Sequence, residues 1–423
     1  MKSVKLLAKT FYGLEEVLAE ELQEIGAQEI SVLKRAVSFE GDQEMLYKAN
    51  LCLRTAVAIL KPVEEFKASD EKILYDQASK IDWSQYLDLE QTFSIDATVF
   101  SKFFNHSKYV ALKTKDAIVD QFRNKHGKRP DVDTQFPDIR INLHVSDDQF
   151  IVSLNSSGEP LNRRGYRQAG HEAPINEILA VGMLKLAGWT PEIQLVDPMC
   201  GSGTFLLEAA MITRNIPPGL KRADFSFMHW PDYDHDLWTK VYNDAVANIN
   251  TNTAKILGSD IARRAVEITR TAAKIFEVDD IIKLEAKPFK RLAAPEGPGI
   301  LMMNPPYGER LNNDDDIDEL YTMIGDTLKK SYAGYEAWIL SSNMDALKHI
   351  GLRASKKMTL MNGALECKFQ KFSMYDGSKK IRPESDEKEA PEEKPHQNRD
   401  ADEGNTGIFK KRENPLLKGR RSE

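Results

Sequence analysis

The spacing of apolar residues changes along the chain, and each change marks an expected element. Near the N-terminus, residues 5–11 are predicted to form a strand. Residues 13–26 repeat apolar positions at helical spacing until Gly26 ends the predicted helix. Two short strands and a second helix, over residues 43–56, are expected to follow. We therefore expect residues 1–60 to form a small α+β unit.

Residues 61–160 mix the two periodicities again. TFSIDATVF (92–100) alternates apolar and polar residues, as a half-buried strand does. Residues 108–130 predict a helix with a basic end, and residues 138–158 predict two strands around a turn at Asp147–Asp148. These patterns indicate a second segment that combines strands with a helix.

From about residue 161 to residue 376, apolar strands alternate with helices. The strands are QLVDPMC, KILGSDI, GILMMNPPYG and EAWILSS. Such alternation predicts an α/β fold with a parallel, doubly wound sheet. Residues 355–375 then indicate an antiparallel hairpin, in which Asn362–Gly363 is expected to supply the left-handed residues of a type I′ turn. A parallel sheet closed by an antiparallel hairpin differs from an ordinary dinucleotide-binding fold.

The last segment, 377–423, is rich in Glu, Lys, Pro, Asp and Arg and contains few apolar residues. Such a composition cannot bury a core, so we expect a disordered, charged tail that aids solubility. Its final stretch, FKKRENPLLKGRR, is basic, and a weak electrostatic arm for RNA is the alternative interpretation.

Composition excludes several classes of protein. No apolar run reaches the length needed to span a bilayer, and the N-terminal stretch lacks the cleavage site of a signal peptide. The cysteines, Cys52, Cys200 and Cys367, are odd in number and far apart, which argues against a disulfide framework or a zinc cluster. We therefore expect a reducing cytoplasm, no membrane and no metal. The net charge of −7 neither supports nor excludes a nucleic-acid partner, because a local basic surface is what meets phosphates.

A local basic surface is expected in the second α+β segment, where aromatic residues lie among cations. A solvated helix surface explains these charges as well as a binding surface does. The functional interpretation is that the cations follow an RNA backbone while the aromatic rings stack on bases. The candidate RNA-binding residues are Lys102, Lys108, Lys113, Lys115, Arg123, Lys125, Lys128 and Arg129.

The first chemical motif is LVDPMCGSGTFLLEAA, in which a strand ends at Asp197 and a turn of small residues leads into a helix. Glycines allow the backbone to approach a ligand closely. A phosphate loop would require a lysine after the second glycine, and a nicotinamide site would require a glycine where Leu206 stands. An acid at the strand end suits a cationic ligand. The motif therefore favours S-adenosylmethionine, whose ammonium Asp197 can attract while backbone N–H groups take its carboxylate.

A second acid, Asp260, ends the next predicted strand and is placed to accept hydrogen bonds from ribose hydroxyls. Between the two motifs, residues 214–250 form an expected insertion rich in Trp, Phe and Pro. His229 and His235 lie in it among aspartates, but a packed loop is favoured over a metal site.

The second chemical motif is GILMMNPPYGERL, which delivers Asn304–Tyr307 to the carboxyl edge of the predicted sheet. The amino nitrogen of a base is a poor nucleophile because its lone pair is delocalised into the ring. The Asn304 side-chain oxygen and the Pro305 carbonyl can accept its hydrogens, and Tyr307 can stack on an extruded base. The two prolines make the turn rigid. A proline-rich turn alone is a weak signal, but this one follows the glycine motif in the expected order.

Together these residues resemble the bacterial 23S rRNA guanine-N2 methyltransferases that carry a THUMP domain, including a group once labelled N6-adenine-specific DNA methylases. The resemblance covers nearly the whole chain up to about Asp376. It implies a ferredoxin-like unit at 1–60, a THUMP domain at 61–160 with a start as early as about residue 44, and a Rossmann-like class I methyltransferase domain at 161–376. The stretches that carry it are GLEEVLAEEL, YKANLCLRTA, LNRRGYRQAGHEAPINEILAVGML, DPMCGSGTFLLEAA and NPPYGERL.

The resemblance also implies roles for single residues. Relatives often place an acid at the end of the third strand, to bind the adenine amino group. Here EAKPFKRL has Lys287 and Pro288 near that place, and Phe289 is the remaining candidate for packing on adenine. The implied catalytic residues are Asn304, Pro305, Pro306 and Tyr307. The implied cofactor contacts are Asp197, Pro198, Cys200, Gly201, Ser202, Gly203, Thr204, Asp260, Ile261, Phe289, Ala173 and Pro174.

Three functions compete. The lead hypothesis is methylation of N2 of a guanine in 23S rRNA or in a large-subunit precursor. The second is adenine N6 methylation of DNA or RNA, because N-P-P-Y serves both bases; no separate target-recognition region of the size that a sequence-specific DNA enzyme needs is evident. The third is a non-catalytic RNA-binding factor in ribosome assembly, against which the intact glycine and N-P-P-Y motifs argue.

Overall fold

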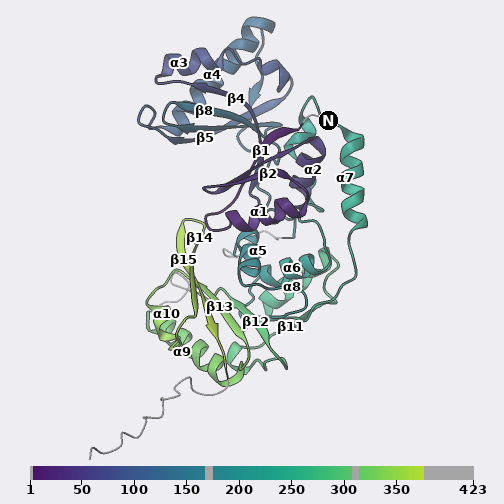
Figure 1. Ribbon diagram of the computed structural model, residues 1–423, viewed down its shortest axis with the longest axis vertical. Coiled ribbons are helices and arrows are strands. Elements are labelled where there is room, and N and C mark those ends of the chain that lie inside the picture. Colours follow the sequence, from purple (N-terminus) through teal and green to yellow (C-terminus); the bar gives the residue numbers. More distant parts are fainter. Residues whose placement is uncertain (1–2, 167–174, 307–313, 376–423) are drawn as a thin grey trace, which may run out of the picture. The chain divides into compact units, whose positions relative to one another are not determined.

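The computed structural model describes residues 3–166, 175–306 and 314–375, which contain one sheet of eight strands and one of seven (Figure 1). Strands of the larger sheet lie between Val4 and Asn155, and strands of the smaller sheet lie between Gln194 and Ser373. No helix in these described ranges is long and apolar enough to cross a membrane.

The strands and helices predicted near the N-terminus are confirmed. Gly26, with a φ of 89°, ends the first helix in the left-handed conformation that glycine adopts without strain. The two helices cover one face of the strands, where Leu6, Val37 and Phe39 form a core. The elements are β1 Val4–Lys9, α1 Glu15–Glu24, β2 Gln28–Leu33, β3 Ala36–Gly41 and α2 Gln43–Cys52.

One long strand, β4 (Ala58–Lys67), joins this unit to the next. It pairs with β1 through Ala58–Leu60 and with β8 (Gln149–Asn155) through Leu60–Lys67. The strand order β2-β3-β1-β4-β8-β7-β5-β6 therefore continues without a break across both α+β segments. Periodicity alone separates the two segments and does not predict this shared sheet, because strand pairing is a long-range property.

In the second segment, helices α3 and α4 cover one face of the sheet. On β7, Ile139, Ile141 and Leu143 are buried beneath them, whereas the alternate residues Asn142 and His144 lie on the opposite, more open face. The elements are α3 Glu71–Ala78, η1 Trp83–Gln85, β5 Thr92–Phe100, α4 Ser107–His126, β6 Asp131–Val132 and β7 Ile139–Ser146.

The smaller sheet has the strand order β11-β10-β9-β12-β13-β15-β14. Its first five strands pair in parallel, and β15 is antiparallel to both of its neighbours. The expected parallel sheet closed by an antiparallel hairpin is therefore confirmed. The strands are β9 Gln194–Asp197, β10 Ile256–Ser259, β11 Ile282–Glu285, β12 Gly299–Met303, β13 Glu336–Ser341, β14 Lys356–Asn362 and β15 Leu365–Ser373.

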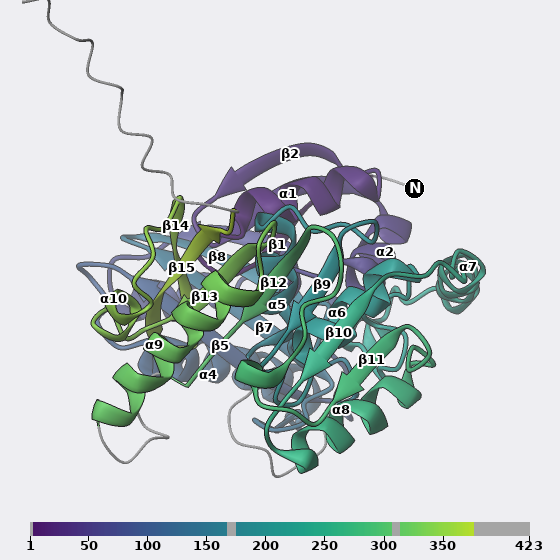
Figure 2. The ribbon, with the colours of Figure 1, turned by 90° about the horizontal axis from the view of Figure 1, so that it is seen from below.

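Helices cover both faces of this sheet (Figure 2). On β12, Ile300 and Met302 join a core with α5, α6 and α8, whereas Leu301 and Met303 join a core with α9 and α10. Successive residues of a strand point to opposite faces, so the continuous apolar run of β12 serves both cores. The helices are α5 Glu177–Leu186, α6 Thr204–Thr213, α8 Arg263–Ile275, η3 Phe289–Arg291, α9 Asp314–Ser331 and α10 Ala346–His349.

The hairpin differs from the prediction at its turn. Asn362 ends β14 and pairs with Leu365, so the connection is Gly363–Ala364. Of these residues, Gly363 alone has a positive φ, of 64°. A type I′ turn at Asn362–Gly363 would need two left-handed residues, and that prediction is wrong. The register of β14 with β15 keeps Asn362 in the strand and leaves the left-handed position to glycine.

The predicted insertion at 214–250 packs back onto the N-terminal unit. It contains η2 (Ser226–His229) and α7 (His235–Ala247). The rings of Phe227 and Trp238 lie 4.5 Å and 5.9 Å from that of Tyr47 on α2, between ring centroids. Residues from the second half of the chain therefore complete the core of the first half.

Candidate active site

The turn after β9 is held by its own backbone and by Asp260. The Gly203 N–H donates to the Cys200 carbonyl at 2.7 Å. The Asp260 carboxylate accepts from the N–H groups of Gly201 and Ala262, each at 2.9 Å. The acid predicted to contact ribose therefore also holds the glycine turn against the end of β10. Ser202 is partly buried on this turn, and Pro198 and Thr204 are buried at its two ends.

Two glycines of this turn are required by its shape. Gly201 and Gly203 have φ values of 52° and 76°, both left-handed. A Cβ on Gly203 would lie 2.2 Å from Cγ2 of Thr269 on α8. The Thr269 hydroxyl donates to the Gly201 carbonyl at 3.1 Å, so α8 supports the turn from behind. Sequence reasoning missed Thr269, because a small residue on an amphipathic helix carries no signal of such a contact.

Replacing Gly203 with alanine is expected to displace this turn and to weaken binding of S-adenosylhomocysteine. The left-handed conformation costs a non-glycine residue about 1–2 kcal/mol, or roughly 5- to 30-fold in affinity, before the clash with Thr269 is counted. Titration calorimetry would measure the loss. The double change Gly203→Ala with Thr269→Ala should recover part of it, because the clash is removed and the strained φ remains. An unchanged affinity in Gly203→Ala would contradict a ligand role for the turn.

Asp197 ends β9 as a buried acid, 2 % exposed. Burial raises the pKa of its carboxyl well above the usual range, and the nearby Asp260 raises that pKa further. Within the described part of the chain, its carboxylate accepts a hydrogen bond from the Met199 N–H, at 3.2 Å. A buried carboxylate with so little compensation is suited to a cationic ligand group.

Asn304 and Pro305 directly follow β12, at the same edge of the sheet as Asp197, because β12 and β9 are parallel neighbours. The Asn304 Oδ1 atom is buried and accepts no hydrogen bond from any described residue. Leaving a buried acceptor without a donor costs about 1–3 kcal/mol. This atom is therefore ready to accept a hydrogen from a ligand. Pro305 is buried and Pro306 half-buried, and Tyr307 lies outside the described residues.

The end of β11 differs from the sequence interpretation. The strand ends on Glu285, an acid that the sequence reasoning passed over in favour of Lys287 and Pro288. Lys287 and Lys283 contact the Glu285 carboxylate at 2.7 Å and 2.9 Å, and these bonds lower its pKa. An acid therefore does occupy the strand end, the place at which the resemblance implies an adenine contact. Its position as the last residue before Ala-Lys-Pro was the available signal.

Phe289 and Ile261, both predicted to contact the cofactor, lie in different surroundings. Phe289 is 2 % exposed, and its ring centroid lies 5.4 Å from that of Tyr332, inside the core formed with α9. Ile261, directly after Asp260, is 76 % exposed. Of the two, Ile261 is the one whose side chain is open to a ligand.

The linker before α5 is anchored to α6 by buried charges. The Arg164 Nε donates to Glu208 Oε1 at 3.4 Å, and the Tyr166 hydroxyl donates to the same oxygen at 2.9 Å. All three side chains are buried. Because α6 begins at the glycine turn, these contacts connect the linker to the helix that carries the turn. Sequence reasoning missed them, since charges in a linker usually indicate a solvated surface. Ala173 and Pro174 lie outside the described residues.

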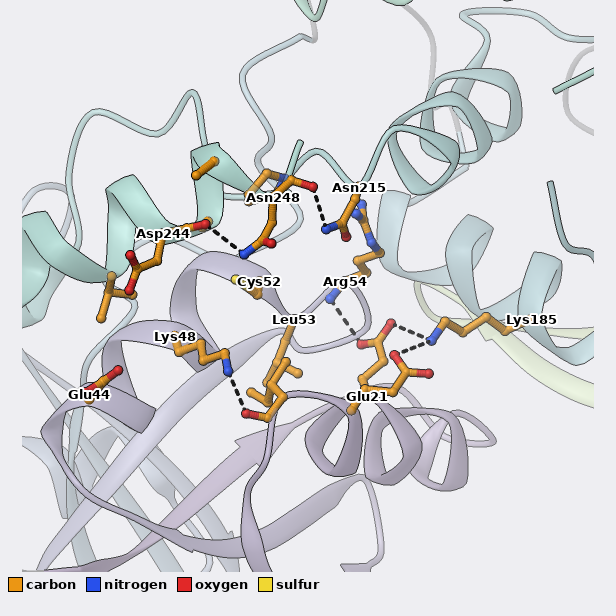
Figure 3. A pocket seen from close by; sticks show the side chains of 16 residues that line it. Glu21, Glu44, Lys48, Cys52, Leu53, Arg54, Lys185, Asn215, Asp244 and Asn248 are labelled. Carbon is orange, nitrogen blue, oxygen red and sulfur yellow. Dashed lines mark hydrogen bonds and ion pairs between the residues drawn. The ribbon is translucent and has the colours of Figure 1, made fainter. Parts of the chain in front are cut away.

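A polar hollow of about 630 Å³ lies between the N-terminal unit and helices α5 and α7 (Figure 3). Lys185 pairs with Glu21 at 3.4 Å and with Glu24 at 3.7 Å. The Lys48 ammonium donates to the Ile25 carbonyl at 2.8 Å, and the Arg54 guanidinium donates through Nη2 to the Ile216 carbonyl at 2.8 Å. These charges already have partners within the protein, so we assign the hollow to the interface between the two halves of the chain.

The predicted RNA-binding cations gather along α4 and at its ends, on the helical side of the larger sheet. Some already have partners: Lys115 pairs with Asp116 at 2.6 Å, and Arg123 pairs with Asp120 at 2.8 Å. Lys113 lies 5.3 Å from the ring centroid of a tyrosine. The exposed members of the set are Lys102, Lys108, Arg123, Lys125, Lys128 and Arg129.

No group of three or more His, Cys, Asp or Glu side chains in the described ranges could hold a metal ion. In the insertion, the His229 ring lies 3.0 Å from an Asp224 oxygen. His235 begins α7 and contacts the Tyr233 ring edge-on. His229 is therefore the last residue of η2 and His235 the first of α7.

The chain matches three domain families. An RlmL ferredoxin-like domain matches residues 5–60, a THUMP domain matches residues 68–155, and an RMKL-like methyltransferase domain matches residues 164–371.

Named relatives match most of the chain. The chain is 40% identical to slr0064 of Synechocystis sp., which is named as an RNA methyltransferase, over 86% of this chain and 95% of that protein. It is 38% identical to the ribosomal RNA large subunit methyltransferase K/L of Syntrophotalea carbinolica, over 88% of this chain and 54% of the relative. The chain thus spans about half the length of that enzyme. The crystal structure of SMU.472, named as a methyltransferase in complex with S-adenosylhomocysteine, is 34% identical, with a TM-score of 0.79 over 89% of this chain and 100% of the other.

Proposed function

This chain belongs to the family of RMKL-like methyltransferases that carry a THUMP domain, and we propose that it methylates N2 of a guanine in 23S rRNA. The methyltransferase class and the Rossmann-like fold follow from the family. The predicted cofactor, S-adenosylmethionine, is confirmed for the family by SMU.472, which was solved with the demethylated product. The observation that carries the proposed chemistry is the buried Asn304 Oδ1 atom, an acceptor without a described donor.

The residues at the sheet edge fit this cofactor. Asp197 would hold the ammonium of the methionine part, and the turn of Gly201–Gly203 would present N–H groups to its carboxylate. Asp260 would accept from ribose hydroxyls with the lone pairs that Gly201 and Ala262 leave free. Bound there, S-adenosylmethionine supplies an electrophilic methyl group on a sulfonium.

Asn304 and Pro305 act on the nucleophile. The Asn304 Oδ1 and the Pro305 carbonyl accept the two hydrogens of the guanine amino group. This arrangement favours a tetrahedral nitrogen whose lone pair is available for attack. In the transfer, the nitrogen would gain a bond to the methyl carbon as the bond from that carbon to sulfur breaks with its electron pair left on sulfur, and the nitrogen would release one hydrogen to water as a proton. Two prolines hold the acceptors in place before the base arrives, so positioning supplies much of the rate enhancement.

An RNA substrate is supported by the names of the relatives, by the THUMP match and by the exposed cations of α4. The tetrapeptide N-P-P-Y is compatible with methylation of either guanine N2 or adenine N6. The choice of guanine N2 therefore rests on the resemblance of N-P-P-Y together with its surroundings. An enzyme with this substrate would work in the cytoplasm, where ribosomes are assembled.

Tritium transfer from labelled S-adenosylmethionine tests the proposal directly. Total RNA and genomic DNA would be prepared from cells lacking the protein, incubated with the purified chain and digested to nucleosides. We expect the label in large-subunit rRNA as N2-methylguanosine. Label in N6-methyladenine would overturn the choice of base, and label in DNA would overturn the choice of RNA. No label in either nucleic acid would favour the non-catalytic factor.

A further inference from the structure

A second basic and aromatic surface lies where the N-terminal unit meets the hairpin of the smaller sheet. The loop after β1 contacts β14: a Cβ on Gly13 would lie 3.1 Å from Leu360 Cδ2 and 3.2 Å from the Thr359 carbonyl oxygen. Figures 1 and 2 both place the end of β2 beside β14. The contact hollow, of about 460 Å³, is lined by Tyr12, Gly13, Glu15, Met358, Thr359 and Leu360.

Glu15 builds this surface by holding two segments together. Its carboxylate accepts from the Gly13 N–H at 2.7 Å and from the Arg35 N–H at 2.9 Å. The Thr10 N–H donates to the Arg35 carbonyl at 3.0 Å. The loop after β1 and the turn between β2 and β3 are therefore fixed to each other. The Glu15 carboxylate already accepts two hydrogen bonds within the protein.

The side chains on this surface are available for binding. Tyr12 is 47% exposed, and Lys34 and Arg35 are exposed on the turn. No described residue forms an ion pair with Lys34, Arg35 or the half-buried Lys9. By contrast, Lys115 and Arg123 of α4 each form one. Burial lowers the pKa of Lys9; Asp96 opposes this shift and Arg35 adds to it, so these charges lie within electrostatic reach of one another.

The hairpin beside this surface reaches past the catalytic edge. Because β14 is parallel to β13 and β12, its end lies at the edge of the sheet that carries Asn304. The last residue of β13, Ser341, pairs with Lys368, so the strand positions 365–367 extend beyond β13. An RNA strand leaving the catalytic edge along the hairpin would meet Tyr12 and the cations next to it.

We propose that Tyr12, Lys9, Lys34 and Arg35 bind the single-stranded RNA that flanks the target guanine. Tyr12 stacks on an unpaired base, and the three cations contact phosphates. This inference rests on the proposed RNA substrate and adds a binding surface to the α4 cations. An exposed ring among unpaired cations suits a nucleic acid, whose bases and phosphates alternate at short spacing, better than an acidic protein surface, which offers no planar ring to stack.

Fluorescence anisotropy with a labelled single-stranded RNA 12-mer and the full chain tests the surface. We expect Tyr12→Ala to lower RNA affinity about tenfold or more, because it removes the stacking free energy between one base and the ring. Tyr12→Phe should retain the affinity, because the ring remains. The double change Lys34→Gln with Arg35→Gln should reduce the slope of log affinity against log salt by about 1.4, which corresponds to two lost phosphate contacts. Lys274→Gln is the matched control, because Lys274 is exposed and without a described ion pair on α8.

The same variants are compared for binding of S-adenosylhomocysteine and for methyl transfer to rRNA. Retained cofactor affinity with a raised KM for rRNA in Tyr12→Ala would support the surface. Wild-type RNA affinity, salt slope and KM in both variants would overturn it and leave the guanine proposal intact. Conversely, variants that lose RNA affinity while the wild-type chain labels no rRNA would overturn the guanine proposal and leave the surface standing.

Discussion

Replacing Asn304 with alanine is expected to slow methyl transfer about 100- to 1,000-fold, the usual effect of removing one fixed polar group that acts on the transition state. Affinity for S-adenosylhomocysteine should stay close to that of the unaltered chain, because the cofactor contacts are assigned to Asp197, the glycine turn and Asp260 and not to the Asn304 side chain. Single-turnover transfer to rRNA and titration calorimetry would measure the two quantities separately.

A neighbouring asparagine provides the control. Asn343 follows β13 at the same sheet edge, but its Oδ1 atom already accepts from the N–H groups of Asp345 and Ala346, at 3.1 Å and 2.9 Å. Asn343→Ala should therefore reduce thermal stability and affect the rate less than Asn304→Ala does. If Asn304→Ala instead loses cofactor affinity in proportion to activity, the residue holds the cofactor and its assignment to the base is wrong.

Replacing Asp197 with asparagine is expected to weaken cofactor binding about 10- to 100-fold, because a hydrogen bond to a charged group contributes about 1.5–3 kcal/mol. The same substitution should stabilise the ligand-free fold. The pKa of Asp197 is raised in the folded protein, so its carboxyl favours folding below its ordinary pKa, and that contribution is lost as pH rises through the raised value. Asparagine carries no proton to lose. The ligand-free variant should therefore gain thermal stability over the unaltered chain, by a margin that grows as pH rises from the ordinary carboxyl pKa toward the raised one.

Thermal unfolding over a series of pH values, paired with calorimetry, checks both parts. Asp232→Asn is the control, since Asp232 is exposed and pairs with Lys61 far from the glycine turn. It should change neither cofactor affinity nor the pH dependence of stability in this way. An Asp197→Asn variant that binds S-adenosylhomocysteine normally would show that the ammonium is held elsewhere.

Local patterns in the sequence determined the order of strands and helices and both chemical motifs. Thr92–Phe100 alternates apolar and polar residues because a strand of this kind buries one face. Gly299–Met303 is continuously apolar because it is buried on both faces. Both patterns can be read from adjacent residues. The glycine turn and Asn304 were found for the same reason, because a tight turn and a strand end are encoded within a few residues. The argument against a nicotinamide or phosphate site likewise rested on single positions such as Leu206.

Only the tertiary structure decided which distant segments meet. The shared strand β4 makes one sheet of two α+β segments, and the insertion around Trp238 completes the core of the N-terminal unit. Thr269, Glu208 and Glu15 act on the site or on the proposed RNA surface through partners between 20 and 68 positions away. Phe289 packs in the core beside Tyr332, and Asn362 stayed in its strand although it precedes a turn glycine. In each case the outcome depends on the register and packing of strands far apart in the sequence, and periodicity over a dozen residues carries no information about them.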